Sequence, residues 1–409
     1  MNILKDFSAS SINAGFTTVL VGFASSVVVI FQAATALGAS EAVISSWILA
    51  LGLGMGIPGV ILSIYYRMPI VTAWSTSGAA VIFTSAVGMP LEKAVGTFIV
   101  CALVTILFGF AGWFEKLIQK IPASIGSGML AGILLRFGLD VFNSMNTRTF
   151  LVVSILLVYL ISVRFKSRYA VLIPLLIGIG ITAFDGSANI SALELELSTP
   201  VFIYPVFSLD AILSLGVPLF FVTMASQNLP GYTVVKNAGF NMPVSPVIGS
   251  IGITTLVLAP FGAFALNLAT LTAAICLGEE AHKEKSKRYT AGIAAGLFYI
   301  LVGLFGATVG SLLTVLPSEL VLGIAGIALF STTANALSMS MAHAPDRDVA
   351  VITFLATASG LTMFNLGAAF WGLVIGLISF IILRVDVGLL LGFKKAKEED
   401  ANKTIQDNS

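Results

Sequence analysis

The chain has 409 residues, of which 57% are hydrophobic and only 10% are charged. Because soluble domains carry about 25% charged residues, this composition excludes a water-soluble globular protein and predicts a polytopic membrane protein. The 21 Lys and Arg residues nearly balance the 20 Asp and Glu residues, so we expect no nucleic-acid partner. Cys101 and Cys276 both lie in apolar stretches. We therefore expect no disulfide, no metal site and no cofactor.

Long apolar segments follow one another along the chain, and a helical span needs about 20 such residues. They cover approximately 12–36, 42–64, 91–113, 123–143, 148–163, 169–184, 210–230, 243–259, 288–313, 318–341, 347–364 and 367–384. Two further apolar segments, 69–87 and 260–278, begin with proline and contain clustered polar residues. We predict that each is half extended and half helical, which gives an all-α protein with fourteen spans. The apolar stretch after Lys5 is too long for a signal peptide, so we expect a retained first helix.

The positions of the basic residues test this count, because Lys and Arg gather in cytoplasmic loops. With the N-terminus inside and the spans alternating, 18 of them fall in inside segments. Only Lys93 and Arg148 fall outside, and Arg136 lies within a span. Omitting either unusual segment spoils this asymmetry. We therefore predict that residues 1–11 and 385–409 are cytoplasmic, and that residues 185–209 form an extracytoplasmic loop. The polar tail from Lys394 onward is predicted to be disordered.

Short sequence echoes divide the chain into two halves. Residues 107–109 and 304–306 both read Leu-Phe-Gly, and each is followed by a Pro with a Gly six residues later. Gly15 and Ser25 correspond to Gly216 and Ser226 at a constant offset of 201 residues. Each half, 12–184 and 210–384, then contains seven spans, and an odd number inverts the second half. Inverted repeats with interrupted spans are typical of secondary transporters.

The two interrupted segments form the candidate substrate site. Backbone polar groups cannot stay unpaired in lipid, so an extended stretch must be buried in protein or line a cavity. We expect residues 69–74 to be extended, with Ser75, Thr76 or Ser77 capping the half-helix that follows. In the second segment we expect residues 261–266 to be extended and Asn267 to be the cap. Two helix starts that face each other at the bilayer centre would hold an anion without a basic side chain.

Polar residues on other spans complete the candidate site. Adjacent amides at Gln227 and Asn228 are costly in a bilayer unless they have partners, and they can donate hydrogen bonds to a carboxylate. The full set of candidate substrate contacts is Ser25, Gln32, Trp74, Ser75, Thr76, Ser226, Gln227, Asn228, Asn267, Leu268, Ala269 and Thr270. Trp74, Phe264 and Phe221 are candidates for the wall around an aromatic substrate. Packing between transmembrane helices explains any single Ser, Thr or amide equally well, Gln32 above all.

Four stretches resemble a known family. They are Asn13-Ala14-Gly15-Phe16, PIVTAWSTSGAA, MASQNLPG and FGAFALNLATLTAAICLGEEAH, and they are similar to the benzoate:proton symporter (BenE) family of bacterial inner membranes. That family is related to the nucleobase and sulfate/bicarbonate transporters. The resemblance implies a seven-plus-seven inverted fold with a core domain (spans 1–4 and 8–11) and a gate domain (spans 5–7 and 12–14). It also implies elevator-like, proton-driven uptake of benzoate through a site between spans 3, 8 and 10, and a homodimer formed through gate domains.

One departure from the related nucleobase transporters concerns charge. Those proteins carry carboxylates in spans 8 and 10, where this chain has Ser226-Gln227 and Asn267. Neutral amides do not repel an anionic substrate, but they do not identify the group that carries the proton. The candidates are Asp140 with Arg136, four residues apart on one helix face, Asp210 at the start of span 8, and the substrate carboxylate itself.

Other functions are disfavoured or stay as alternatives. No paired carboxylates, HExxH pattern or Ser/His/Asp set lies at membrane depth, and His282 and His343 fall in loops, which argues against an enzyme. The sequence contains no selectivity-filter pattern, which argues against a channel. A transporter of another anion or of a nucleobase on the same fold is the alternative hypothesis.

Overall fold

The computed structural model describes residues 3–113, 123–165, 167, 169–188, 195–364 and 366–384, and the protein is mostly helical. Helices, or a short strand followed by a helix, occupy every predicted segment. Six helices are long and apolar enough to cross a membrane, or up to eight spans if each of two bent pairs is one span. The chain is therefore a polytopic helical membrane protein, and the count of fourteen spans stays a prediction. The predicted cytoplasmic tail, 385–409, lies outside the described residues.

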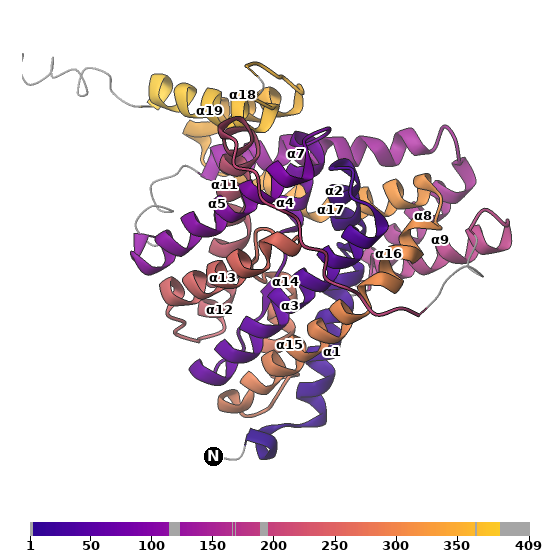
Figure 1. Cartoon of the computed structure of the whole chain (residues 1–409), viewed down its shortest axis with the longest axis vertical. Coiled ribbons are helices and arrows are strands. Elements are labelled where there is room, and N and C mark those ends of the chain that lie inside the picture. Colours follow the sequence, from indigo (N-terminus) through magenta and orange to yellow (C-terminus); the bar gives the residue numbers. More distant parts are fainter. Residues whose placement is uncertain are drawn as a thin grey trace, which may run out of the picture.

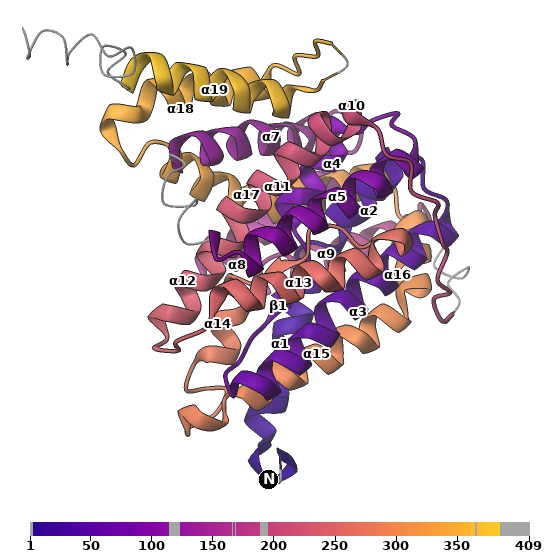
Figure 2. The same ribbon diagram turned by 60° about the vertical axis from the view of Figure 1, so that its left-hand side comes forward.

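One set of helices packs around α3 and α15, which run side by side in Figures 1 and 2. We call this set the α3 group. It contains η1 (Ile3–Asp6), α1 (Ala9–Ala24), α2 (Val27–Ala36), α3 (Glu41–Tyr66), β1 (Thr72–Ala73), α4 (Thr76–Ser85), α5 (Leu91–Phe110), α13 (Val244–Leu258), η5 (Ala259–Phe261), β2 (Asn267–Leu268), α14 (Leu271–Leu277), η6 (Lys285–Lys287), α15 (Tyr289–Leu304) and α16 (Gly306–Thr314). A Cβ on Gly52 of α3 would lie 2.6 Å from Gly303 Cα of α15. Small residues thus allow the close approach that helix packing in membranes favours.

A long helix at Leu209–Asn237 also belongs to the α3 group, and it is not uniformly α-helical. It consists of α10 (Leu209–Ala211), the π-helical turn η3 (Ile212–Gly216), α11 (Val217–Thr223), the π-helical turn η4 (Met224–Asn228) and α12 (Leu229–Asn237). Gly216 packs on α5, where an added Cβ would lie 3.0 Å from Thr97, just as Gly15 of α1 packs on α15. The first helix of each predicted half thus packs on a helix of the other half, as two inverted repeats would require. The repeat itself stays a prediction.

The second set of helices packs around α7, and we call it the α7 group. It contains α7 (Ala123–Ser144), α8 (Thr149–Arg164), α9 (Leu172–Phe184), α17 (Ser318–Ser340), η7 (Ala344–Asp346), α18 (Arg347–Ala358) and α19 (Ala368–Arg384). Figures 1 and 2 show α18 and α19 together at the end of the molecule farthest from the N-terminus. The α3 and α7 groups contain the segments predicted for the core and gate domains, respectively. Whether these groups move against each other stays a prediction.

Two spans that were expected to be continuous are bent. The bend between α1 and α2 is 40°, and the bend between α15 and α16 is 59°. Ser198 fills the second bend: its N–H donates to Leu304 O (2.8 Å), its hydroxyl donates to Gly303 O (3.1 Å), and that hydroxyl accepts from Ala307 N–H (2.9 Å). A side chain inserted into the helical hydrogen-bond ladder is a known cause of a kink. Ser198 is about a hundred residues from this bend in sequence, so the spacing of apolar residues along α15 and α16 could not predict the bend. A smaller difference is that α1 begins at Ala9, with Ser8 as its cap, three residues before the first predicted span.

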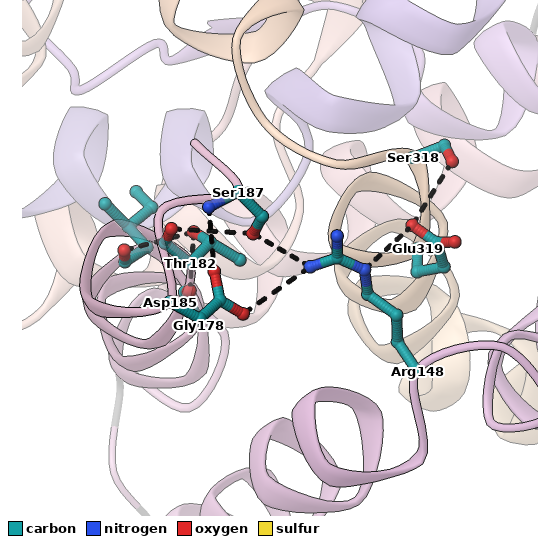
Figure 3. A network of polar contacts seen from close by, with 8 residues as sticks. Arg148, Gly178, Thr182, Asp185, Ser187, Ser318 and Glu319 are labelled. Atoms are coloured by element: carbon teal, nitrogen blue, oxygen red, sulfur yellow. Dashed lines mark hydrogen bonds and ion pairs between the residues drawn. The ribbon is translucent and has the colours of Figure 1, made fainter. Parts of the chain in front are cut away.

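Three helix ends of the α7 group are joined by one basic residue, shown in Figure 3. Arg148, at the start of α8, forms ion pairs with Asp185 at the end of α9 (3.6 Å) and with Glu319 at the start of α17 (3.8 Å). Its guanidinium also donates to the Ser187 hydroxyl (2.8 Å). Hydrogen bonds from the side chain and backbone of Ser187, helped by the charge of Arg148, hold the pKa of Asp185 below its usual range. This network fixes the relative positions of α8, α9 and α17 at one face.

We expect the substitution Arg148→Gln to loosen this end of the α7 group. Partly exposed ion pairs contribute roughly 0.2–1 kcal/mol each, so the loss of both should lower the thermal midpoint in detergent by a few degrees. Differential scanning fluorimetry would measure it, with Lys93→Gln as the matched control. Among the described residues, Lys93 forms one ion pair, with Asp210 at the start of α10 (3.5 Å). A midpoint that falls no more than in the control would show that the network does not stabilise the group.

Candidate substrate site

The two interrupted segments meet at a short antiparallel strand pair. Thr72 of β1 pairs with Leu268 of β2, and Ala73 pairs with Asn267. This pairing satisfies backbone groups that would be costly to leave unpaired inside a bilayer. Both segments are therefore extended before they become helical, as the sequence predicted, and α4 and α14 begin three residues beyond opposite ends of the strand pair.

The first half-helix, α4, begins where the sequence predicted. Ser75 is the N-cap in an extended conformation, and its hydroxyl oxygen accepts from Gly78 N–H (2.9 Å). Thr223 of α11 donates its hydroxyl to the same oxygen (3.2 Å) and so ties the cap to the long helix. The ten-residue helix thus starts inside the protein, where its N-terminus carries a partial positive charge.

The prediction that Asn267 caps the second half-helix is wrong. The chain turns at Gly262 (φ 103°), and the N-cap position of α14 is Thr270. Pairing with β1 holds Asn267 in a strand, so the helix begins only after the strand ends. The Asn267 side-chain amide donates to Ala265 O (3.1 Å), and its buried Oδ1 accepts no hydrogen bond from the described residues. The Thr270 hydroxyl likewise has no hydrogen-bond partner among them.

The π-helical turn η4 brings an amide and a hydroxyl to the start of α4. Gln227 Nε2 donates to Ser77 Oγ (3.0 Å), and the hydroxyls of Ser77 and Ser226 lie 3.0 Å apart. The adjacent Asn228 has a different role, because its Oδ1 accepts from Leu268 N–H (3.0 Å). Gln227 therefore contributes to the first interrupted segment and Asn228 holds the second. A π turn at this position fits the frequent occurrence of such turns at functional sites.

Trp74 connects the first interrupted segment to the bend between α1 and α2. Its indole N–H donates to Ser26 Oγ (2.8 Å), and the Ser26 hydroxyl donates to Gly22 O (2.8 Å). The indole ring also lies 5.3 Å from the Phe23 ring, centre to centre. Trp74 is only 4% exposed. The hydrogen bond and the ring contact together fix its orientation.

A cavity of about 410 Å³ lies between the α3 and α7 groups. The α3 group contributes, among others, Ser25, Ser26, Trp74, Thr76, Gln227, Ala269, Thr270, Thr272 and Tyr299; the α7 group and the connection before α9 contribute Tyr159, Val163, Ser167, Tyr169, Ile327, Ser331 and Thr332. The lining formed by described residues contains hydroxyls, one amide, an indole and aromatic rings, without Asp, Glu, Lys, Arg or His. Its volume and mixed lining are typical of a small-molecule site. It can donate several hydrogen bonds to an anion while it covers an apolar ring.

The structure divides the predicted contacts into two sets. Ser25, Trp74, Thr76, Gln227, Ala269 and Thr270 line the cavity, whereas Gln32, Ser75, Ser226, Asn228, Asn267 and Leu268 do not. Phe264, a candidate for the aromatic wall, is fully buried against Trp47 and Phe98 instead, because the extended chain turns its ring into the α3 group. Phe221 is also absent from the cavity lining.

Sequence reasoning missed the tyrosines and the hydroxyls of α17. Tyr159 and Tyr299 lie within apolar helices and line the cavity, as do Ser331 and Thr332. The chain has only 8 tyrosines. A tyrosine in the middle of a span was therefore an available signal, whereas Ser and Thr are too common in spans to provide one.

The three ionisable residues considered for proton coupling lie outside the cavity lining. Asp210 is exposed at the start of α10, where it pairs with Lys93. Within the described part of the chain, Arg136 and Asp140 form no ion pair at contact distance, although their charges lie close enough to interact. The Arg136 guanidinium instead lies 5.5 Å from the centre of the Phe83 ring of α4, because α7 packs against α4 at this position.

Gln32 provides a stability prediction. Its side chain is 6% exposed, and neither amide atom has a hydrogen-bond partner among the described residues. Leaving a buried polar group unpaired costs about 1–3 kcal/mol, so Gln32→Met should raise the thermal midpoint and leave substrate affinity unchanged. Thermal denaturation and a binding measurement on the same purified variant would check both. A lower midpoint together with weaker binding would show that the amide has a polar partner that matters.

Known proteins match this chain along nearly its whole length. The family described as benzoate membrane transport protein matches residues 5–382. The chain is 44% identical to inner membrane protein YdcO of Escherichia coli over 372 residues, which cover 91% of this chain and 95% of that protein. It is 40% identical to the benzoate membrane transport protein of Acinetobacter baylyi over 379 residues, covering 93% and 96% of the two chains.

Solved structures show the same fold at low sequence identity. The chain matches SLC26A9 with a TM-score of 0.58 and 13% identity, covering 93% of this chain and 66% of that longer one. It matches the transmembrane domain of the cyanobacterial bicarbonate transporter BicA with a TM-score of 0.53 and 16% identity, covering 92% and 96% of the two chains. The fold is thus one that anion transporters use. With the family match along nearly its whole length, the chain belongs to the benzoate membrane transport protein (BenE) family, whose members are transporters and not enzymes.

Proposed function

We propose that this protein imports benzoate, or a similar aromatic carboxylate, together with a proton across the bacterial inner membrane by alternating access. The observation that carries the proposal is the cavity between the α3 and α7 groups, which the start of α4 borders and in which no described lining residue bears a charge. The 40% identity to a benzoate membrane transport protein supports the choice of substrate. The α3 group would be the core domain and the α7 group the gate domain.

The polar end of the cavity suits a carboxylate. Thr76 is the first residue of α4, Gln227 donates to Ser77 beside it, and the Thr270 hydroxyl has no partner among the described residues. Helix N-termini favour negative charge, and hydrogen bonds from neutral donors to a carboxylate are stronger than those to a neutral acceptor. Trp74, Tyr299 and Tyr159 supply aromatic surface for the ring.

The position of the cavity supports alternating access. Its lining includes Ser167 and Tyr169 from the connection between α8 and α9, which the distribution of basic residues assigns to the cytoplasm. We therefore propose that this conformation faces inward. Asp140 and Asp210 lie away from the cavity lining, so neither would contact the substrate in this conformation. Dimerisation through the α7 group is part of the same proposal and rests on the family resemblance.

Uptake of labelled benzoate into proteoliposomes tests this function. With an inward proton gradient, we expect accumulation that protein-free vesicles lack and that a protonophore abolishes. The fold shared with BicA gives the second candidate, transport of another anion. Competition by bicarbonate, sulfate or uracil would favour that alternative if unlabelled benzoate failed to compete. Accumulation equal to that of protein-free vesicles would reject the proposal.

A further inference from the structure

Arg136 is a basic residue at membrane depth that the cavity does not use. It lies eight residues before the end of α7 (Ala123–Ser144), which places it about 12 Å from the predicted outer end of that helix. Its side chain is exposed in the isolated chain. Within the part of the chain that the structure describes, it forms no ion pair or hydrogen bond. The Asp140 carboxylate, one turn further along α7, is close enough to interact with this charge but does not contact it. A charge held in a span is costly and usually marks a functional site.

The neighbours of Arg136 place it where the α7 group meets α4. Its guanidinium lies over the ring of Phe83 in α4 (5.5 Å), and the adjacent Phe137 ring contacts the same Phe83 ring (4.9 Å). Arg136 thus lies in the α7 group and faces the half-helix whose start borders the cavity. The two groups meet there on the outer side of the cavity, because α4 runs from the cavity toward the predicted outer face.

We propose that Arg136 is the loading counter-ion, which pairs with the substrate carboxylate when the carrier faces outward; this rests on the proposed function. Phe83 lies seven residues after Thr76, so about 10 Å along α4 separates the ring now under Arg136 from the helix start. An outward displacement of the α3 group by that distance brings the start of α4, with its bound carboxylate, level with Arg136. The guanidinium geometry matches a carboxylate.

The same displacement explains how the substrate is released inside. When the α3 group returns to the conformation seen here, Phe83 again occupies the position beside Arg136, and the carboxylate keeps only neutral donors such as Thr76 and Gln227. The ion pair therefore strengthens binding in the outward-facing state alone. A ligand shifts a conformational equilibrium only through such a difference in affinity between the two states.

Substitutions of Arg136 distinguish an effect on substrate binding in the outward-facing state from an effect in the inward-facing state. In proteoliposomes where the wild-type protein takes up benzoate, Arg136→Gln should raise the external half-saturation concentration about tenfold or more, since a charged hydrogen bond is lost. Arg136→Lys should raise it less. Lys93→Gln removes the same charge from the outer face and should leave it unchanged. Benzoate binding to detergent-solubilised protein held inward-facing should be equal in the wild type and in Arg136→Gln.

Chemical modification of the variant Arg136→Cys tests the effect of charge within one folded protein. Arg136→Cys, in a background with Cys101→Ala and Cys276→Ala, is treated from outside with a positively or a negatively charged methanethiosulfonate reagent. The positive adduct should restore a low half-saturation concentration and the negative adduct should not. Absence of wild-type uptake would refute the proposed function itself. Wild-type uptake with an unaltered half-saturation concentration in Arg136→Gln, an equal rise in Lys93→Gln, or identical effects of the two reagents would overturn the role of Arg136.

Discussion

Gln227→Ala should weaken benzoate binding by roughly one to two decades while the protein stays folded. Gln227 lines the cavity, and its Nε2 donates to Ser77 Oγ at 3.0 Å beside the start of α4. Loss of one hydrogen bond to a charged group costs about 1.5–3 kcal/mol, which corresponds to that change in affinity. Half-saturation of benzoate uptake and equilibrium binding by calorimetry would measure it.

The isosteric variant Gln227→Glu makes the test sharper. It places a carboxylate where the substrate carboxylate is expected, so we predict loss of transport at neutral pH through repulsion between like charges. Gln32→Met is the matched control, because it also removes an amide from the α3 group but lies outside the cavity lining. Near-normal affinity in both Gln227 variants would move the carboxylate position to another part of the cavity.

Gly262→Ala should prevent the protein from folding, which is the largest stability effect that we expect. Gly262 has a φ of 103°, and an added Cβ would lie 1.8 Å from Trp47 Cδ1. Trp47 is fully buried and packs against the rings of Phe98 and Phe264, so it has no space into which it can move. Overpacking in a dense core and a strained backbone together cost roughly 3 kcal/mol or more. Fluorescence-detected size-exclusion chromatography would show little monodisperse protein.

A glycine with a similar backbone provides the control for this variant. Gly88 has a φ of 77°, and an added Cβ would meet no atom within 4 Å. Gly88→Ala therefore introduces the backbone strain without the clash and should cost only about 1–2 kcal/mol. Equal yields and thermal midpoints for the two variants would contradict the claim that contact with Trp47 makes Gly262 indispensable. The turn at Gly262 directs the second interrupted segment toward β1, so its loss also removes the cavity.

Part of the site was predictable from local sequence. Proline and clustered polar residues at 69–77 identified an interrupted segment, and Ser75 caps the following helix. The same reasoning failed at Asn267, because a partner almost 200 residues away, Ala73, keeps it in a strand. The division of adjacent amides, with Gln227 at the cavity and Asn228 on Leu268 N–H, also needed the π-helical turn. No local pattern predicts such a turn.

By itself, the sequence determined that the chain is a polytopic membrane protein, where its apolar segments lie and which two of them are interrupted. These properties follow from the composition, the positions of proline and the spacing of apolar residues. Each of them depends only on residues that are close together in sequence. Only the tertiary structure decided which polar side chains line the cavity, that Arg136 lies over the Phe83 ring, and that Ser198 fills the bend in α15–α16. Those outcomes depend on strand pairing and helix packing between residues far apart in sequence. The direction of a side chain in a membrane protein is set by such long-range contacts, because lipid exerts little hydrophobic preference between one apolar helix face and another.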